Sequence, residues 1–447
     1  MMMAIATSSM MAITMAAPFW RTGAVESNKL ALGDFIASGK YGAVCWAQYD
    51  GEKCVAKRSS DGAEFMEEAP TLDELKRATK RSAEYLDTEA EVARLIIERT
   101  QQRSSLDMHD KTVAPYLGSC FKDGCRYLVW RAAGEETLDD FFADGTDRLP
   151  ELARALGCQE SELPRRVLTD VLRCLAHIHA CGIAHRDVKP ANILVDADAK
   201  TLRLIDFGSS ADCAGWLSAE RRGLRPDRVS ASLLFTPTSK AGRPRAFDDR
   251  AGWYQYDMYA AALVWLCVAV PDLAADYDNL YELRMALKAN EHDAEKWRSA
   301  CESSRSAQPG EQLPAVQSPE QCAVPMTESF EAVFGWQTPR PRQLWRRIFR
   351  RPRSASPTRQ SKAASEGGGG DATETLAWDL LTSLLDSDGA KRPSAAEALL
   401  GRYLNEDCLA EDLPMSPPEP WTLEGLVGAT GAGPPRRVAA DACQVPE

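Results

Sequence analysis

The pattern of hydrophobic and polar residues predicts a small antiparallel sheet near the start of the chain. We expect three strands, over residues 32–36, 43–49 and 52–57. Asp50-Gly51 separates the last two, and this dipeptide is a strong hairpin signal because both central positions of such a turn need a positive φ. Residues 113–130 predict a second hairpin around Lys122-Asp123-Gly124. The first part of the chain is therefore expected to be rich in strands.

Helical periodicity dominates the later part of the chain. Residues 71–103 predict one or two helices, and Thr71 and Glu74 have the spacing of a capping box. We expect further helices over 152–180 and from Tyr254 onward, and short strands at 193–195 and 202–205. Strands first and helices later indicate an α+β fold with one sheet-rich and one helical lobe.

Composition narrows the class of protein. The 447 residues are 44% apolar and 26% charged, which is enough for a large core. The net charge of −12 argues against a general nucleic-acid-binding protein. Thirteen cysteines at irregular spacing do not form a disulfide scaffold. The apolar run over residues 258–270 is too short to span a membrane, so we interpret it as a buried helix.

Three segments differ in composition from the rest. Residues 1–24 carry Arg21 as their one charge, which fits either an organelle-targeting segment or a disordered start. Residues 302–373 are rich in Ser, Pro, Gln and Gly and predict a disordered insertion. Residues 378–403 return to helical periodicity, and residues 404–447 predict a disordered tail.

The most informative run is His185-Arg186-Asp187-Val188-Lys189-Pro190-Ala191-Asn192, with Asp206-Phe207-Gly208 following a short apolar strand. Phosphoryl transfer from ATP needs metal ions, positioned phosphates and an oriented hydroxyl rather than covalent help from the protein. Carboxylate, amide and lysine side chains at this spacing suit those tasks. In these motifs the chain resembles the protein kinase family, over about residues 32–403.

The resemblance implies a two-lobed protein kinase fold over residues 25–403, with the N-lobe at about 25–133 and the C-lobe at about 134–403. It implies that Asp187 orients the attacking hydroxyl and accepts its proton, while Lys189 steadies the transferring group. It also implies that Asp206 and Asn192 bind Mg²⁺. Lys189 after the catalytic aspartate favours serine/threonine over tyrosine specificity.

The upstream segments supply the expected ATP contacts. Glycines between the first two strands allow backbone N–H groups to approach phosphate oxygens, and the family's first loop glycine is Ala37 here. Lys57, in Val55-Ala56-Lys57, is expected to pair with the α- and β-phosphates. By resemblance the ATP-binding residues are Ile36, Gly39, Gly42, Val44, Ala56, Lys57, Glu91 and Leu194.

The partner of Lys57 is open between two glutamates. Glu91 best fits the family's helix pattern, and Glu89 is close enough to compete. Thr88 and Glu91 have capping-box spacing as well, so a helix start at Thr88 is an alternative. The separation of 34 positions from Lys57 to Glu91 suggests an extra helix in the interval.

Two further residues fit structural roles in the family. Asp257 fits a buried aspartate that anchors the catalytic loop, with a helix N-cap as the alternative. Arg392 fits a late arginine whose usual partner is the glutamate of an Ala-Pro-Glu motif. The nearest match is Thr236-Pro237-Thr238, so that salt bridge is expected to be absent or replaced.

Arg186 suggests control by a phosphorylated residue of the activation segment, for which the candidates are Ser218, Ser230 and Ser232.

Two groups of residues look like other sites. Helical spacing places His177 and His179 on different faces, which argues against a zinc site with Cys181 and His185. Cys120 and Cys125 flank a predicted turn and form either an oxidisable pair or, as we favour, two reduced thiols.

Shorter motifs resemble the thylakoid state-transition kinases, which phosphorylate light-harvesting antenna and photosystem proteins. They include Leu128-Val129-Trp130-Arg131, Tyr256-Asp257-Met258-Tyr259 and Arg392-Pro393-Ser394. The resemblance favours a chloroplast location, with the cytoplasm as the alternative. Residues 340–359 hold eight arginines with interleaved apolar residues, which fits either a peripheral membrane contact or a solvated linker.

The sequence thus predicts a serine/threonine protein kinase that uses ATP and Mg²⁺ and acts on protein substrates. Two rival functions stay open. A catalytically silent kinase-fold scaffold draws on the departures at Ala37 and Thr238. A small-molecule phosphotransferase of the kinase-like superfamily would share the spacing of Asp187 and Asn192.

Overall fold

The computed structural model describes residues 25–39, 42–60, 71–103, 111–142, 148–214, 235, 250–269, 272–275, 277–290, 293, 296 and 369–405. Several predictions from the sequence fall outside these residues. They concern the segment 1–24, the candidate phosphosites Ser218, Ser230 and Ser232, the Thr236-Pro237-Thr238 motif, most of the predicted insertion with its arginine-rich run at 340–359, and the tail from residue 406.

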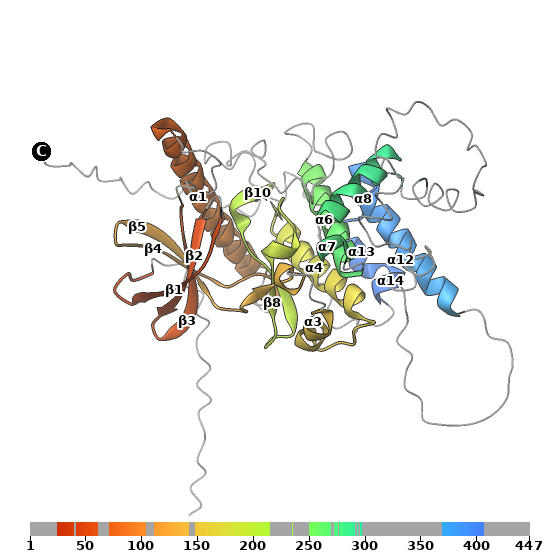
Figure 1. Ribbon diagram of the computed structural model, residues 1–447, viewed down its shortest axis with the longest axis horizontal. Helices are drawn as coiled ribbons and strands as arrows, with labels where there is room; N and C mark the ends of the chain where they lie inside the picture. The colour runs from red at the N-terminus through yellow and green to blue at the C-terminus, as the bar shows by residue number, and fades with distance from the viewer. Residues whose placement is uncertain are drawn as a thin grey trace, which may run out of the picture. The chain divides into compact units, whose positions relative to one another are not determined.

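A five-stranded antiparallel sheet occupies the first part of the chain (Figure 1). Its order is β1-β2-β3-β5-β4, with bounds Leu30–Gly39, Gly42–Tyr49, Glu52–Arg58, Cys125–Arg131 and Tyr116–Lys122. The two hairpin turns are those that the sequence predicted. Asp50, Gly51, Asp123 and Gly124 all have positive φ, as Asp-Gly turns of this kind require.

One long helix, α1 (Leu72–Gln102), packs against this sheet. The predicted capping box is present, because Thr71 accepts from the backbone N–H of Glu74 and the Glu74 side chain accepts from that of Thr71. Thr88 lies inside the helix, where its hydroxyl donates to the carbonyl of Glu84, so the alternative helix start at Thr88 is wrong. Within the described part of the interval from Lys57 to Glu91, this single helix accounts for the extra length.

The second part of the chain is mainly helical. It contains α3 (Leu149–Leu156), α4 (Leu163–Ala180), α6 (Arg250–Ala269), α7 (Asp272–Ala275), α8 (Tyr277–Ala289), α12 (Gly369–Leu385), α13 (Ala395–Leu400) and α14 (Arg402–Asn405). α12 begins at Gly369, so the end of the segment predicted as a disordered insertion is helical. The run from Met258 is buried within α6, as expected. In the portion that the structure describes, no helix is both long and apolar enough for a membrane crossing.

Two small antiparallel sheets carry the loops that hold the candidate site. The first has the order β6-β8-β9, from Glu136–Thr137, Ile193–Asp196 and Thr201–Leu204. The second pairs β7 (Ile183–Ala184) with β10 (Ala211–Asp212). The run from His185 to Asn192 leaves β7 and enters β8, and Asp206 follows β9. The short strands therefore fix both ends of the catalytic run and place Asp206 beside it.

Candidate active site

A cavity of about 560 Å³ brings together residues from both parts of the chain. Its lining includes nine residues that the sequence predicted, namely Ile36, Gly42, Val44, Lys57, Asp187, Lys189, Asn192, Leu194 and Asp206. They come from β1, β2, β3, the catalytic run, β8 and the segment after β9. Gly39 ends β1 opposite Gly42, and its proposed contact with ATP stays a prediction.

Because Gly42 has no side chain, there is room beside it for the side chain of Lys57. A Cβ at this position would lie 2.9 Å from Lys57 Cε and 3.1 Å from the Arg58 carbonyl oxygen. A larger residue here would therefore require a shift of the Lys57 side chain and a small movement of the Arg58 carbonyl on β3. The glycine between the first two strands therefore has a steric role at Lys57 in addition to the expected contact with phosphate.

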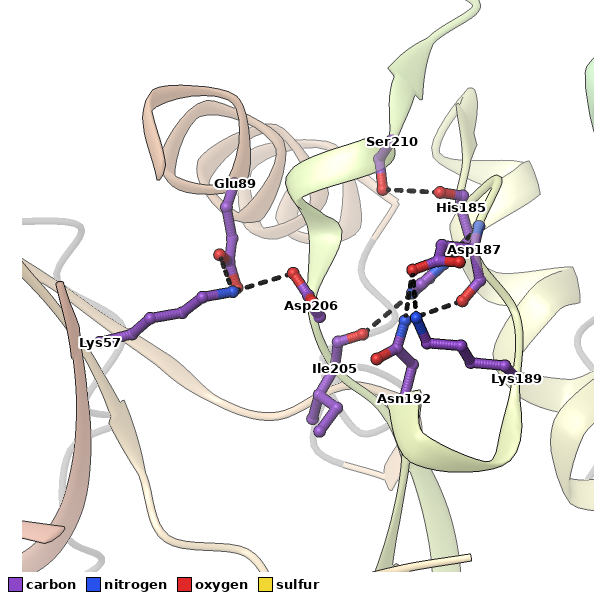
Figure 2. Close-up of polar contacts among 9 residues, drawn as sticks. All are labelled: Lys57, Glu89, His185, Asp187, Lys189, Asn192, Ile205, Asp206 and Ser210. Carbon is purple, nitrogen blue, oxygen red and sulfur yellow. Dashed lines mark hydrogen bonds and ion pairs between the residues drawn. The ribbon is translucent and has the colours of Figure 1, made fainter. Parts of the chain in front are cut away.

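Lys57 contacts two carboxylates (Figure 2). Its Nζ lies 2.7 Å from Glu89 Oε2 and 2.9 Å from Asp206 Oδ1. The prediction of Glu91 as the partner was wrong, because Glu91 forms an ion pair with Arg94, one turn along α1. The sequence held a signal for Glu89: Val92, Ala93 and Ile96 follow it at i+3, i+4 and i+7, which is the buried face of the helix.

Burial and charge shift the pKa values of this cluster. Burial would lower the pKa of Lys57, but Asp206 and Glu89 outweigh it and raise the pKa, so the lysine stays cationic. Burial would raise the pKa of Asp206, yet Lys57 outweighs burial and lowers this pKa to about 2. Burial raises the pKa of Glu89 to about 7 against the opposing effect of Lys57. Asp206 is thus ionised at neutral pH, as a metal ligand must be.

The catalytic run places two polar side chains, those of Lys189 and Asn192, beside the carboxylate of Asp187. Lys189 Nζ donates to Asp187 Oδ2 at 2.9 Å, and Asn192 Nδ2 donates to Asp187 Oδ2 at 3.0 Å and to the Asp187 carbonyl at 2.8 Å. These bonds fix the carboxylate of Asp187 at the cavity (Figure 2). A fixed carboxylate that faces a cavity can orient a hydroxyl and accept its proton.

Asp257 holds the start of this run. Its carboxylate accepts from the backbone N–H groups of His185 at 2.8 Å and Arg186 at 2.7 Å. Asp257 lies within α6 and is fully buried, so the role as anchor is supported and the N-cap alternative is wrong. Arg186 has φ 66°, a strained conformation for a residue other than glycine. The two bonds to Asp257 help to hold that conformation in place.

The segment from Asp206 is strained in the same way. Asp206 has φ 62°, and the Phe207 ring lies 5.0 Å from the ring of His185. A Cβ on Gly208 would meet Tyr85 Cδ1 at 2.8 Å, so glycine allows α1 to approach closely. Strain of this kind is found where the surrounding structure sets the position of a functional side chain.

The donor set fits a magnesium ion. Mg²⁺ prefers hard oxygen ligands, and it usually binds through one or two carboxylates together with substrate phosphates. Asp206 offers an ionised carboxylate to the cavity. Because the amide nitrogen of Asn192 is directed to Asp187, its carbonyl oxygen is directed away from that residue. Asp206 and Asn192 are therefore the residues that would hold the ion.

The predicted role of Ala56 was wrong. Ala56 is fully buried in a cluster with Cys54, Ala47 and Val129, whereas Val55 lines the cavity beside Lys57. The reason is the period of two along a strand, which places residues 55 and 57 on one face and residue 56 on the other. Sequence reasoning also missed the lining residues Tyr85, Leu86, Trp130, Thr137 and Ile205.

The residues considered for zinc have other partners. His177 contacts Thr100 and Thr112, His179 Nε2 lies 2.9 Å from Asp257 Oδ2, and His185 Nε2 lies 3.0 Å from the Ile205 carbonyl oxygen. These contacts explain the histidines as structural. Cys120 and Cys125 are free thiols, with Tyr127 and Lys122 as their cross-strand partners.

Arg392 is buried and contacts backbone rather than an acidic side chain among the described residues. It donates to the carbonyls of Asp386 and Gln255, each at 2.9 Å, and its guanidinium lies 5.0 Å from the centre of the Tyr259 ring. Burial lowers the pKa of Arg392 to about 10. Thr236-Pro237-Thr238 lies outside the described residues, so the expectation that the usual salt bridge is absent or replaced stays a prediction.

Comparison with known families gives one match, the protein kinase domain, over residues 73–404. Among curated proteins, a serine/threonine-protein kinase STN8 of Arabidopsis thaliana, described as chloroplastic, is 32% identical over 215 residues, which are 42% of this chain and 43% of the relative. The chloroplastic serine/threonine-protein kinase STN7 of the same plant is 26% identical over 43% of this chain and 38% of its own. The match thus spans less than half of either relative.

A solved structure shares the fold. The crystal structure of a Stt7 homolog from Micromonas algae, soaked with ATP, matches 88% of this chain and 96% of its own with a TM-score of 0.54. At 20% identity this similarity concerns the fold alone. It confirms the predicted α+β architecture with a sheet-rich and a helical part.

Proposed function

Since the chain belongs to the protein kinase family, we propose that it transfers the γ-phosphate of ATP to serine and threonine hydroxyls of proteins. One observation carries the proposal: Asp187, Lys189 and Asn192 line the same cavity as the Lys57–Glu89–Asp206 cluster. The first group suits the attacking hydroxyl, and the second suits the phosphates and their metal.

The protein residues divide the work. Asp187, fixed by Lys189 and Asn192, orients the hydroxyl of the protein substrate and accepts its proton as the bond from this oxygen to the γ-phosphorus forms and the bond from the γ-phosphorus to the ADP oxygen breaks. Lys57, fixed by Glu89, pairs with the α- and β-phosphates, and Lys189 stabilises charge on the transferring group. Mg²⁺, when bound by Asp206 and Asn192, neutralises charge on the phosphates.

We further propose chloroplast proteins of the thylakoid membrane, antenna or photosystem subunits, as the substrates. The proposal is supported by the two Arabidopsis relatives, which are described as chloroplastic serine/threonine-protein kinases. It is also supported by the motifs around Trp130 and Asp257 that the sequence shares with state-transition kinases.

The test measures phosphate transfer from γ-labelled Mg·ATP by the full chain, first to a generic protein and then to isolated thylakoid membranes. Asp187→Asn is the control, because it keeps the shape of the side chain and removes the base. We expect phosphoserine and phosphothreonine with the wild type, and a loss of roughly 10²- to 10⁴-fold with the variant. ATP binding without transfer to any protein would instead favour the silent scaffold. Transfer to generic proteins but not to thylakoid proteins would reject the proposed substrates alone.

A further inference from the structure

The end of α1 is joined to the segment that follows Asp206-Phe207-Gly208. Arg99 Nη1 and Nη2 donate to the two carboxylate oxygens of Asp212, at 2.7 and 2.9 Å, and Nη1 also donates to the Cys181 carbonyl at 2.8 Å. Asp212 is buried, with 4% of its side chain exposed. Two parallel bonds between a guanidinium and a carboxylate are among the strong interactions in proteins, and they fix both groups in direction as well as distance.

Asp212 lies where two functional segments cross. It belongs to β10, which pairs with β7, and β7 leads directly into His185. At the crossing Gly182 has φ 75°, its carbonyl accepts from the N–H groups of Cys213 and Ala214, and a Cβ on it would meet Ala214 Cβ at 2.3 Å. The contacts of Arg99 are therefore made to a tightly packed part of the catalytic framework.

The same helix carries the partner of Lys57. Glu89 and Arg99 are ten residues apart on α1, which corresponds to about 15 Å of continuous helix. The backbone hydrogen bonds of a helix of this length resist bending. A displacement of one end therefore displaces the other end as well. Fixing Arg99 therefore limits where Glu89 can lie relative to the sheet.

We infer that Arg99 is a positioning residue: by joining α1 to Asp212 it sets Glu89 against Lys57, and Asp212 supplies the negative charge for this joint without phosphorylation. The inference deepens the proposed kinase function and rests on it for its activity measurements.

The contacts of Arg186 are consistent with a link between Arg99 and Asp212 that needs no phosphate. Arg186 is buried, its Nε donates to the Ser209 carbonyl at 2.6 Å, and its guanidinium lies 5.0 Å from the centre of the Trp253 ring. These described contacts of Arg186 are made within the fold, and its predicted pairing with a phosphorylated residue stays a prediction because the candidate serines lie outside the described residues.

Arg94 provides a matched control on the same helix. It forms ion pairs with Glu91 and Glu98, so among the described residues its charged partners lie on α1 itself. Arg99→Met and Arg94→Met remove the same charge from the same helix, but only Arg99→Met removes the two hydrogen bonds to Asp212. Arg99→Met is expected to fold, because the neighbouring Thr100 keeps its 2.9 Å contact with His177 of α4.

The experiment measures Mg·ATP affinity and phosphate transfer in the full chain. We expect Arg99→Met to raise the Kd for Mg·ATP about tenfold and to lower kcat by about 10²-fold, and Arg94→Met to change either by less than about twofold. Arg99→Lys is expected to recover only part of the loss, since an ammonium cannot form the two parallel bonds. In a Glu89→Gln background, Arg99→Met should add less than about twofold, because the residue it positions is already gone.

Equal effects of Arg99→Met with and without Glu89 would overturn the inference and leave Arg99 a merely structural role.

The claim that Asp212 supplies its charge without phosphorylation is tested by phosphatase treatment of the wild type. Mass spectrometry then confirms that no phosphate is left on the protein. Unchanged Mg·ATP affinity and unchanged phosphate transfer are expected, and a loss of either would overturn the role given to Asp212.

Hydrogen exchange of the α1 backbone is a readout that needs neither ligand nor activity. Faster exchange around Glu89 in Arg99→Met, but not in Arg94→Met, would support the joint even if the wild type transferred no phosphate.

Discussion

Glu89 and Lys57 form a buried ion pair of 2.7 Å that joins α1 to β3. Glu91, two residues along the same helix, pairs with Arg94 at a partly exposed position. The two glutamates therefore offer a direct comparison within one helix. Glu89→Gln is expected to lower kcat/KM by about 10²-fold, because it leaves Lys57 without its buried partner.

Glu91→Gln is the matched control for that prediction. We expect it to change kcat/KM by less than about twofold, since a partly exposed ion pair at the helix surface contributes little and does not contact the cavity. Both variants are measured in steady-state transfer assays with varied ATP. A larger loss with Glu91→Gln than with Glu89→Gln would contradict the pairing seen in the structure.

Loss of the Asp257 carboxylate is expected to lower both the free energy of unfolding and the rate of phosphate transfer. Asp257→Ala removes the acceptor for two buried N–H groups, those of His185 and Arg186, and should cost about 3 kcal/mol in the free energy of unfolding. Phosphate transfer should fall as well, because these bonds hold the catalytic run. Asp379→Ala, at an exposed position of α12, is the control and should cost less than about 0.5 kcal/mol. Urea unfolding curves give the comparison, and equal costs would rule out the anchoring role.

Two glycines with positive φ should respond differently to alanine. Gly51 has φ 85° with no atom within 4 Å of an added Cβ, so Gly51→Ala should cost about 1 kcal/mol from backbone strain alone. Gly182 has φ 75° and an added Cβ would lie 2.3 Å from Ala214 Cβ, so Gly182→Ala adds a steric clash. We expect its cost to exceed that of Gly51→Ala by at least about 1 kcal/mol. Thermal unfolding of the two variants decides the point, and equal costs would contradict the close crossing at Gly182.

The pH dependence of stability should carry a contribution from Glu89. Its pKa is about 7 in the folded protein, above the ordinary value of 4.5, so the folded state binds this proton more tightly than the unfolded state. The stabilisation from this group is complete below pH 4.5 and is lost as the pH rises through 7. Glu89→Gln has no such titration.

The free energy of unfolding of the wild type, relative to that of Glu89→Gln, should therefore fall between pH 4.5 and 7. The slope is at most about 1.4 kcal/mol per pH unit for one proton. Urea unfolding of both proteins at several pH values gives this difference. A difference that is constant with pH, or that rises, would show that Glu89 is not the group whose pKa is raised.

Local patterns were enough to predict several parts of the fold. The Asp-Gly turns at residues 50–51 and 123–124, the capping box at Thr71 and the buried run in α6 all lie where the sequence placed them. Each depends on residues within a few positions of one another, so its energetics are visible in the sequence. The error at Ala56 was also local, because the period of the strand already assigned Val55 to the face of Lys57.

By itself the sequence determined the order of strands and helices and the set of side chains that the chemistry needs, because these follow from local periodicity and from motifs with fixed spacing. Only the tertiary structure decided which side chains meet. Glu89 rather than Glu91 reaches Lys57, and Arg99 meets Asp212 across 113 residues of chain. Such pairings depend on how α1 is rotated and where it ends against β10. Packing of the whole core sets that rotation, and no short stretch of sequence contains it.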